Sequence, residues 1–179
     1  LPTVASSRFL EGLPGVDFRA GKIPDFAEVN PLLDQATGWS LVAVPGIVDD
    51  RTFFELLAAR RFPATTWLRT PAQLDYLEEP DMFHDVFAHV PLLTDQYFAD
   101  FLQAVGTLAL RYLHDPHAVE LLSRLYWFTV EFGLIAEGDR LRIYGAGILS
   151  SAGETKFCLS DGPDRRPFDV AHILATPYV

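Results

Sequence analysis

The chain has little cysteine and no long apolar run, and each absence excludes a class of protein. Its 179 residues include one cysteine, Cys158, so no disulfide can form within the chain. Cys158 lies in the apolar run Phe157-Cys158-Leu159, where we expect it to be a small buried hydrophobic residue. No stretch approaches the roughly 20 apolar residues that a membrane-spanning helix needs. We therefore expect no membrane association and a cytoplasmic location, which also fits the low cysteine content.

Positive charge is also scarce. The chain has 14 lysines and arginines against 24 aspartates and glutamates, which gives a formal net charge of −10. An acidic surface repels phosphate backbones and anionic headgroups, so we expect neither a nucleic-acid partner nor docking on a charged membrane. Hydrophobic residues make up 49% of the chain and aromatic residues 13%, which is enough for a substantial core.

Nothing in the composition divides the chain into parts. Proline and glycine are scattered, no internal repeat is visible, and the length suits one domain. The first residues contain no basic segment followed by an apolar one, as a signal peptide would. Because the sequence starts at Leu1 and stops abruptly at Val179, we expect one domain over residues 1–179 that lacks native residues at its C-terminal end.

Apolar periodicity predicts an α+β domain that is predominantly helical, with a few short strands. Asp49 and Asp50 suit the start of a helix over 52–62, and Thr94 and Asp95 suit the start of a longer helix that ends near Tyr112. Further helices are predicted over 71–76, 81–89, 117–134 and 170–174. Strands are predicted at 39–44, within 62–68 and after residue 140. The helix over 117–134 is expected to bury the stripe Leu121, Leu125, Phe128 and Phe132.

Two histidines, His84 and His89, lie five residues apart in the helix predicted over 81–89. On a regular α-helix this spacing separates two side chains by about 140° around the axis. That is a poorer arrangement for sharing a metal ion than the usual four-residue spacing. We expect Pro91 to end the helix close to His89. By spacing alone, one half-buried and one surface histidine is the more ordinary interpretation.

The surroundings of the histidines favour a metal site. Phe83 and Phe87 make this helix apolar, and a buried imidazole needs a polar partner. Asp85 lies beside His84 and could orient a histidine that binds a metal.

A carboxylate follows later in the chain, because Glu131 stands alone in the apolar stretch 125–132 with Trp127 one turn before it. Two histidines and one carboxylate form the facial triad of non-haem Fe(II) oxygenases. The alternative is an exposed Glu131 paired with Arg124.

Three segments resemble the biopterin-dependent aromatic amino acid hydroxylases. Residues 79–93, EPDMFHDVFAHVPLL, resemble the family signature E-P-D-x-x-H-[DE]-x-x-G-H-V-P. Residues 126–133, YWFTVEFG, and residues 144–151, YGAGILSS, resemble the family's YWFTVEFG and YGAGLLSS. The resemblance extends from about residue 23 to the end. Residues 62–63 and 67–71 resemble the bacterial branch.

The resemblance implies a role for each of several residues. It implies that His84, His89 and Glu131 bind Fe(II), with Asp85 as a further catalytic carboxylate near the metal. It implies that Arg69 pairs with the substrate carboxylate, because two N–H groups of a guanidinium can donate to the two carboxylate oxygens. The other residues implied for the substrate are Pro80, Trp127, Gly147 and Ser150. Those implied for tetrahydrobiopterin or a related reduced pterin are Gly46, Ile47, Val48, Phe53 and Tyr126. Without the resemblance, all of these are ordinary loop, turn or core residues.

The activity implied is that of a monooxygenase, which hydroxylates L-phenylalanine to L-tyrosine with O2, Fe(II) and a reduced pterin, as in bacterial phenylalanine catabolism. Trp127 resembles the phenylalanine and tyrosine branches rather than the tryptophan branch. Tyrosine or tryptophan hydroxylation stays open, as do a 2-oxoglutarate-dependent oxygenase and a non-catalytic domain that binds a metal or an amino acid. The tetramerisation segment of animal members is absent, so we expect a monomer.

The sequence departs from the family at a few positions. Ala88 replaces the usual glycine, Leu77 stands where animal members have a threonine near the substrate, and Pro63 replaces a histidine near the pterin. The region that separates phenylalanine from tyrosine hydroxylation lies around Tyr178 and Val179. Each change leaves the implied metal ligands intact.

Overall fold

The computed structural model describes residues 1–16, 22–75, 77 and 79–178, and helices predominate among them. In chain order the elements are α1 (Ser7–Gly12), η1 (Leu13–Val16), α2 (Phe26–Thr37), β1 (Ser40–Ala43), α3 (Asp50–Ala58), β2 (Arg61–Ala64), η2 (Pro71–Gln73), η3 (Phe83–His89), α4 (Val90–Leu93), α5 (Gln96–Tyr112), α6 (Pro116–Tyr126), η4 (Trp127–Glu131), β3 (Leu134–Glu137), β4 (Arg140–Ile143), α7 (Ala146–Leu149), α8 (Ala152–Cys158) and α9 (Val170–Ala175). The strands of the described part form two separate pairs, β1 with β2 and β3 with β4. The predicted fold class, α+β and predominantly helical, is confirmed.

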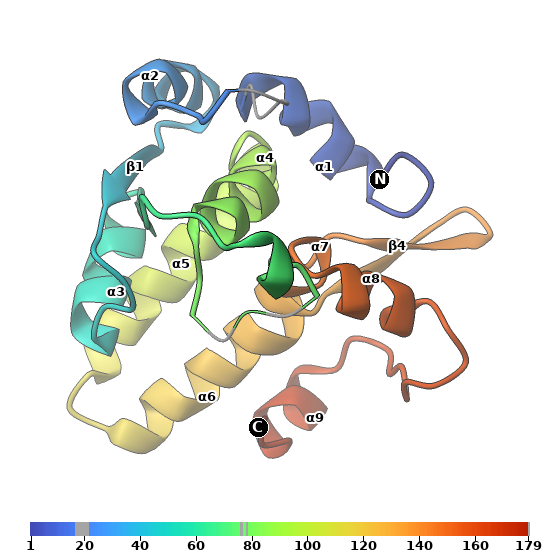
Figure 1. The fold of residues 1–179 in the computed structure, drawn as a ribbon. Helices are drawn as coiled ribbons and strands as arrows, with labels where there is room; N and C mark the ends of the chain where they lie inside the picture. The colour runs from blue at the N-terminus through green and yellow to red at the C-terminus, as the bar shows by residue number, and fades with distance from the viewer. Residues whose placement is uncertain (17–21, 76, 78, 179) are drawn as a thin grey trace.

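The long helix α5 lies against α3 and α6 (Figure 1). Asp95 begins it, because its carboxylate accepts a hydrogen bond of 3.0 Å from the Phe98 amide. Small residues let the neighbouring helix approach closely: a Cβ on Gly106 would lie 2.6 Å from the amide nitrogen of Ala58. The predicted helix is confirmed, but Tyr112 at its end is 45% exposed and does not belong to the buried side.

The chain turns sharply between α3 and β2. Arg60 adopts a positive φ of 56°, so α3 ends at Ala58 and not at residue 62 as predicted. The Arg60 guanidinium fixes this turn by donating hydrogen bonds of 2.5 Å to the Thr37 carbonyl and 2.9 Å to Gln103. Strand β2 then pairs in parallel with β1, the strand predicted at 39–44.

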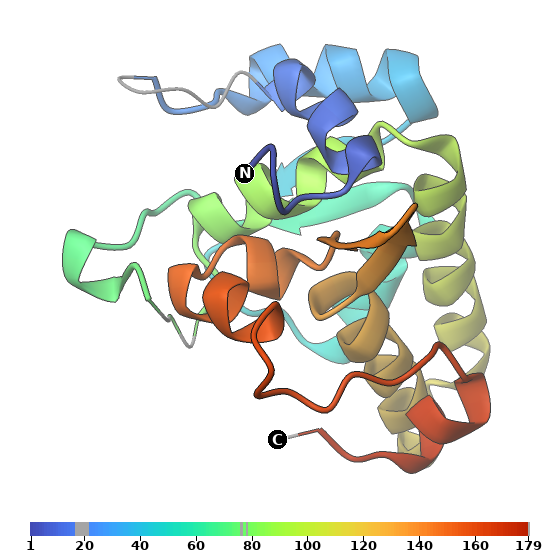
Figure 2. The same cartoon turned by 90° about the vertical axis from the view of Figure 1, so that its right-hand side faces the viewer.

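The N-terminal segment joins the hairpin of β3 and β4. The Ser6 amide donates to the Ile143 carbonyl at 2.8 Å, and the Ile143 amide donates to the Val4 carbonyl at 2.8 Å. Helix α1 then packs on α4, as Figure 2 shows at the top of the view. The contact is close, because a Cβ on Gly12 would lie 2.0 Å from the Pro91 carbonyl oxygen.

Two of the predicted α-helices contain π-helical turns. Residues 83–89 form the π-helix η3, which continues directly into α4, so the prediction that Pro91 ends the helix is wrong. Pro91 occupies the first turn of α4, where the missing proline N–H costs little. The helix predicted over 117–134 is α6 followed by the π-helix η4, and strand β3 begins at Leu134.

The predicted apolar stripe of this second helix is also wrong. Its members Leu121, Leu125, Phe128 and Phe132 are only partly buried. The side chains that are fully buried there include Val119, Leu122, Thr129 and Val130. Within α6 the buried side runs through Val119 and Leu122 and not through Leu121 and Leu125, so the predicted stripe was already on a neighbouring side of the helix. After Tyr126 the wider π-turn rotates the buried side further, to Thr129 and Val130.

The two remaining predicted helices correspond to observed elements with small shifts. Helix α9 corresponds to the short helix predicted at 170–174, and η2 corresponds to the turn predicted at 71–76, of which Tyr76 lies outside the described residues. Among the described residues, no helix combines the length and the apolar character needed to cross a membrane.

We predict that Gly12→Ala destabilises the fold. The added Cβ would collide with the Pro91 carbonyl, so the free energy of unfolding should fall by at least about 2 kcal/mol, more than the gain in helix propensity. Urea unfolding followed by circular dichroism measures the change. Gly15→Ala is the matched control, because the nearest atom to its Cβ would lie 4.0 Å away. Equal stability of the two variants would contradict the packing argument.

We also predict that Cys158 is chemically inert in the folded protein. The residue is 6% exposed, and burial, together with the charge of Glu154, raises the pKa of its thiol from 9.0 to about 11. The thiolate fraction near pH 8 is therefore about 100-fold lower than in the unfolded chain. Reaction with a disulfide reagent, followed with and without guanidinium chloride, measures this. Labelling as fast in the folded state as in the unfolded state would refute it.

Candidate metal centre and adjoining cavities

His84, His89 and Glu131 bring three donor atoms together between η3 and η4. His89 Nε2 lies 3.1 Å from Glu131 Oε1 and 3.1 Å from His84 Nε2, and His84 Nε2 lies 3.6 Å from Glu131 Oε2. Metal bonds of about 2.1 Å at right angles would place neighbouring donors about 3 Å apart. One donor atom from each of the three residues lies within 4.8 Å of the others, so the three side chains are close enough to hold one metal ion from the same side. Glu131 is 8% exposed, so its predicted alternative, an exposed pair with Arg124, is wrong.

The π-helix explains how a five-residue spacing can serve one metal. A π-helix forms hydrogen bonds between residues five apart, which brings such residues onto the same side of the helix. His84 and His89 use this geometry in η3. The carboxylate comes from a second π-helix, in which the Phe132 amide donates to the Trp127 carbonyl at 3.0 Å, again five residues apart. The separation of about 140° between the two histidines holds only for a regular α-helix, and residues 83–89 do not form one.

The electrostatics of the cluster suit a metal cation. Burial by itself raises the pKa of Glu131, but the imidazoles of His89 and His84 outweigh burial and lower it to about 2. Burial lowers the pKa of His84, against the opposing charge of Glu131. At neutral pH the cluster is thus an ionised carboxylate beside a neutral His84 imidazole, the protonation states in which both bind metals.

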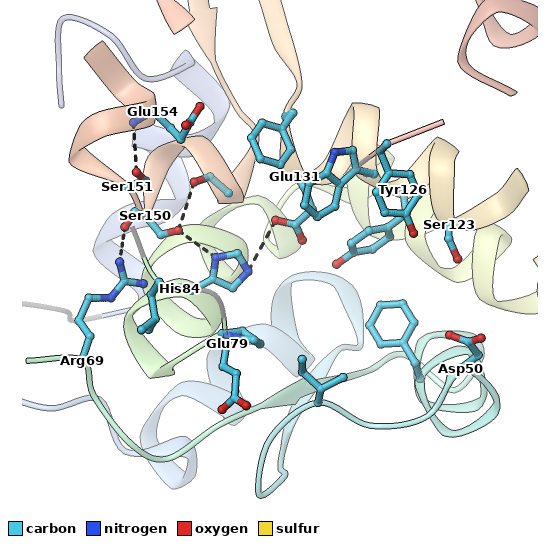
Figure 3. Close-up of a pocket in the computed structure, with 18 of the residues that line it drawn as sticks. Asp50, Arg69, Glu79, His84, Ser123, Tyr126, Glu131, Ser150, Ser151 and Glu154 are labelled. Atoms are coloured by element: carbon cyan, nitrogen blue, oxygen red, sulfur yellow. Dashed lines mark hydrogen bonds and ion pairs between the residues drawn. The ribbon is translucent and has the colours of Figure 1, made fainter. Parts of the chain in front are cut away.

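Ser150 fixes the ring of His84. Its hydroxyl lies 2.9 Å from His84 Nδ1, and this contact leaves Nε2 directed toward Glu131. Figure 3 shows Ser150, His84 and Glu131 in one row across the pocket. A hydrogen bond at one ring nitrogen selects the tautomer whose other nitrogen can bind a metal.

Arg69 and Asp81 form a buried ion pair at one end of this row. Arg69 Nη2 donates to Asp81 Oδ1 at 2.6 Å, and Arg69 Nε donates to Asp81 Oδ2 at 3.0 Å. Arg69 Nη1 also donates to the Ser150 carbonyl at 2.6 Å. Burial raises the pKa of Asp81, but the hydrogen bonds from Arg69 and from the His84 amide outweigh it and lower the pKa. Because a guanidinium has five N–H groups, two remain without a partner among the described residues.

Asp85, the other carboxylate that the sequence singled out, bonds to a different neighbour. Its Oδ2 accepts hydrogen bonds from the Thr65 amide at 2.7 Å and from the Thr65 hydroxyl at 2.8 Å. Burial raises the pKa of Asp85, against the charge of His84 and these hydrogen bonds. The carboxylate therefore fastens the end of β2 to η3. Its catalytic role stays a prediction.

Two cavities meet at the cluster, and His84 and Glu131 line both of them. The larger has a volume of about 360 Å³ and extends past Arg69 (Figure 3). All the residues predicted for the substrate line it: Arg69, Pro80, Trp127, Gly147 and Ser150. The smaller has a volume of about 150 Å³, and all the residues predicted for the pterin line it: Gly46, Ile47, Val48, Phe53 and Tyr126.

Aromatic contacts hold the wall between the cavities. The rings of Phe53 and Tyr126 meet edge to face with centroids 5.3 Å apart, and both residues line both cavities. Burial, together with the charges of Glu131 and Asp85, raises the pKa of Tyr126 well above its ordinary value, so its hydroxyl keeps its proton.

The matching family is the biopterin-dependent aromatic amino acid hydroxylases, and the match covers residues 3–179. The chain belongs to this family. The match begins earlier than residue 23, where the sequence resemblance was first apparent. It includes the N-terminal segment that pairs with β4.

Characterised hydroxylases are similar over the whole chain. Phenylalanine-4-hydroxylase from Chromobacterium violaceum is 52% identical over 179 residues, which cover 99% of this chain and 60% of that protein. The enzyme from Ralstonia nicotianae is also 52% identical, with 57% of its length covered. The crystal structure of the Chromobacterium enzyme with bound iron(III) and oxidised 7,8-dihydrobiopterin has a TM-score of 0.95 at 53% identity, and the match covers 100% of this chain and 65% of that one. The chain thus spans about three fifths of the length of these relatives.

The sequence left several cavity residues unnoticed. Asp50, Ser123, Glu154 and Tyr178 also line the larger cavity. Asp50 had been noticed only as a helix start, and Tyr178 only as a neighbour of the region that separates substrates. Val179, the other residue of that region, lies outside the described residues. Side chains on separate helices carry no local motif, so only a family comparison of pocket positions would have found them.

We predict that the cluster binds a divalent transition metal. Co(II) at 100 times its dissociation constant should stabilise the fold by about 2.7 kcal/mol and raise the thermal midpoint. Glu131→Ala removes the anionic donor and should abolish both the stabilisation and the visible absorption of bound Co(II). Glu79→Gln is the matched control, because Glu79 is an exposed carboxylate that lines the same cavity outside the cluster. Unchanged Co(II) binding in Glu131→Ala would show that the donors lie elsewhere.

Proposed function

We propose that this chain is the catalytic domain of a phenylalanine 4-monooxygenase that requires Fe(II), a reduced pterin such as tetrahydrobiopterin, and O2. The observation that carries the proposal is the placement of His84, His89 and Glu131 where the two cavities meet. The Chromobacterium enzyme has been solved with iron(III) and 7,8-dihydrobiopterin and, in a separate structure, with iron and phenylalanine, which supports a pterin and an amino acid as the ligands beside the metal.

The donor set fits iron on the evidence of its own residues. His89 Nδ1 is buried and has no hydrogen-bond partner among the described residues, so the ring is held by packing and by its contacts at Nε2. Two imidazoles and one carboxylate leave three positions of an octahedral ion free. When bound, Fe(II) and the reduced pterin would supply the activation of O2, which no amino-acid side chain can provide.

Arg69 would hold the amino-acid substrate by its carboxylate. The two N–H groups without a partner suit a carboxylate, and the pair with Asp81 keeps the guanidinium in one orientation. Ser150 would connect this subsite to the metal, since its carbonyl binds Arg69 and its hydroxyl contacts His84. A substrate anchored in this way lies in the same cavity as Trp127, which would act as a wall for its ring.

The pterin would occupy the smaller cavity. Phe53 and Tyr126 provide aromatic surfaces there for a flat heterocycle, while Gly46 leaves room because nothing lies within 4 Å of where its Cβ would be. Ile47, 74% exposed, and Val48 complete the loop beside it. Asp85 would act near the metal by keeping this side of η3 attached to Thr65.

Several further properties belong to the proposal. Residues 1–179 would act as one domain, as a monomer in the cytoplasm of a bacterium, with no nucleic-acid partner, as the acidic composition and the bacterial relatives favour.

The second candidate is a tyrosine or tryptophan hydroxylase of the same family. Phenylalanine is favoured because three relatives that are 52%, 52% and 51% identical to this chain are phenylalanine-4-hydroxylases.

The decisive experiment supplies L-phenylalanine, O2, Fe(II) and a tetrahydropterin and measures the formation of L-tyrosine. We expect product only when both iron and pterin are present. Glu131→Gln should reduce kcat by at least about 100-fold, since it removes the charge of a metal ligand. Glu11→Gln, an exposed carboxylate on α1, is the control and should leave kcat unchanged.

Parallel assays separate the remaining candidates. Faster turnover of L-tryptophan or L-tyrosine than of L-phenylalanine would select the second candidate. A folded, iron-loaded chain that forms no product from any of the three amino acids would be a binding domain, and the proposed activity would be wrong.

A further inference from the structure

We infer that Arg124 is a positioning residue that clamps the C-terminal segment onto α6, so that Tyr178 closes the larger cavity against Trp127. We call residues 166–178 the C-terminal strap. The inference rests on the proposed function, because it assigns the larger cavity to the amino acid. It adds Arg124, a residue outside the predicted site, as the group that positions the region around Tyr178 to which the family resemblance assigned the choice of substrate.

The strap has little buried surface of its own. Of residues 166–178, only Ile173 is fully buried, and Phe168 is 69% exposed. Figures 1 and 2 show that a long loop follows α8 and leads through the strap to α9, which packs on α6. A segment with so few apolar contacts depends on specific interactions to hold one position.

Arg124 supplies one such interaction. Its Nη1 donates a hydrogen bond of 2.5 Å to the carbonyl of Leu174, in the last turn of α9. Carbonyls at a helix C-terminus lack partners within the helix, and a cation is favourable there. Glu120 holds the guanidinium from the other side by accepting a bond of 2.5 Å from Nη2. The Arg124 side chain is only 12% exposed.

Tyr178 supplies the contact with the cavity. Its ring stacks on Trp127 with centroids 4.9 Å apart and planes at 17°. Trp127 follows Arg124 by three residues, one turn along the same helix side. Tyr178 follows Leu174 by four residues and lies beyond the end of α9 at Ala175, where the chain becomes extended. The clamp and the ring stack therefore attach neighbouring points of the strap to neighbouring points of the α6–η4 helix.

This arrangement places the strap in the substrate wall. Trp127 and Tyr178 both line the larger cavity, as do Arg69 and the metal-binding candidates His84 and Glu131. Trp127 also contacts Phe132, with centroids 4.7 Å apart, but Phe132 belongs to the same chain segment and cannot close the cavity from outside. Release of the strap would admit water beside Trp127 and widen the space for the substrate ring. The strap should therefore tighten binding of the amino acid and limit its size.

The test compares Arg124→Gln, Arg124→Lys and Tyr178→Ala with Arg111→Gln, an exposed arginine on α5 that serves as the control. Three quantities are measured: KM and kcat for L-phenylalanine, the ratio of kcat/KM for L-tryptophan to that for L-phenylalanine, and the rate of trypsin cleavage after the exposed Arg165. The cleavage rate reports on attachment of the strap and needs no enzyme activity.

We expect Arg124→Gln to raise KM by about tenfold and to change kcat by less than about twofold. The strap contributes equally to binding of the substrate and of the transition state, so its release weakens binding without slowing the bound substrate's reaction. The tryptophan ratio should rise and trypsin cleavage should accelerate. Tyr178→Ala should change KM and the ratio in the same way, and the double variant should be no worse than the worse single variant. Arg124→Lys should keep KM, the substrate ratio and the cleavage rate close to the wild-type values, because an ammonium can still bind the Leu174 carbonyl.

Wild-type values of KM, substrate ratio and cleavage rate in Arg124→Gln would overturn the inference. So would additive effects in the double variant, because Arg124 would then not act through Tyr178. If Arg124→Gln does not fold, Tyr178→Ala decides, and wild-type values of KM and of the substrate ratio in this variant would overturn the inference. If the wild-type chain forms no product, the proposed function fails, while faster cleavage in Arg124→Gln would still support the clamp and unchanged cleavage would reject it.

Discussion

The wide winding of two π-helices is the constraint on which the metal cluster depends. In an α-helix, His84 and His89 would point to different sides, and in η3 their Nε2 atoms lie 3.1 Å apart. A π-turn has poorer backbone geometry than an α-turn and persists where the surroundings favour it. Here η3 is packed between α4, α7 and β2, and it continues into α4 without a break. The stability of the core therefore offsets the cost of holding two imidazoles on one side of a helix.

The carboxylate is placed by close backbone approach rather than by its own helix alone. A Cβ on Gly145 would lie 2.3 Å from the Glu131 carbonyl oxygen, so only glycine allows α7 to come this near to η4. The same approach brings Ser150, one residue beyond α7, to His84. The segment YGAGILSS thus acts as a unit, in which the glycines set the distance and the serine sets the orientation of an imidazole.

Buried charge is concentrated around the cavities. The Arg69–Asp81 pair has side chains 5% and 0% exposed, and such pairs contribute more to a unique arrangement than to net stability. Asp81 also accepts a hydrogen bond of 3.0 Å from the His84 amide, so the ion pair at the substrate end is attached to the start of the metal-binding helix. The proposed substrate subsite and the candidate metal cluster are therefore held in place by one connected group of side chains.

The sequence by itself determined the helical α+β class and most of the helices and strands. Through its resemblance to the family, and not through spacing, it also singled out the three residues that the structure brings together as a candidate metal cluster and several residues that line the two cavities. Spacing alone argued against His84 and His89, because the π-helix arises from tertiary packing and leaves no period in the sequence. Only the tertiary structure decided that Asp85 bonds to Thr65 and that Arg124 bonds to Glu120 and Leu174 instead of Glu131. Partners such as Tyr178 and Trp127 lie 51 residues apart in the chain, and their contact follows from the path of the strap over α6, which no local pattern encodes.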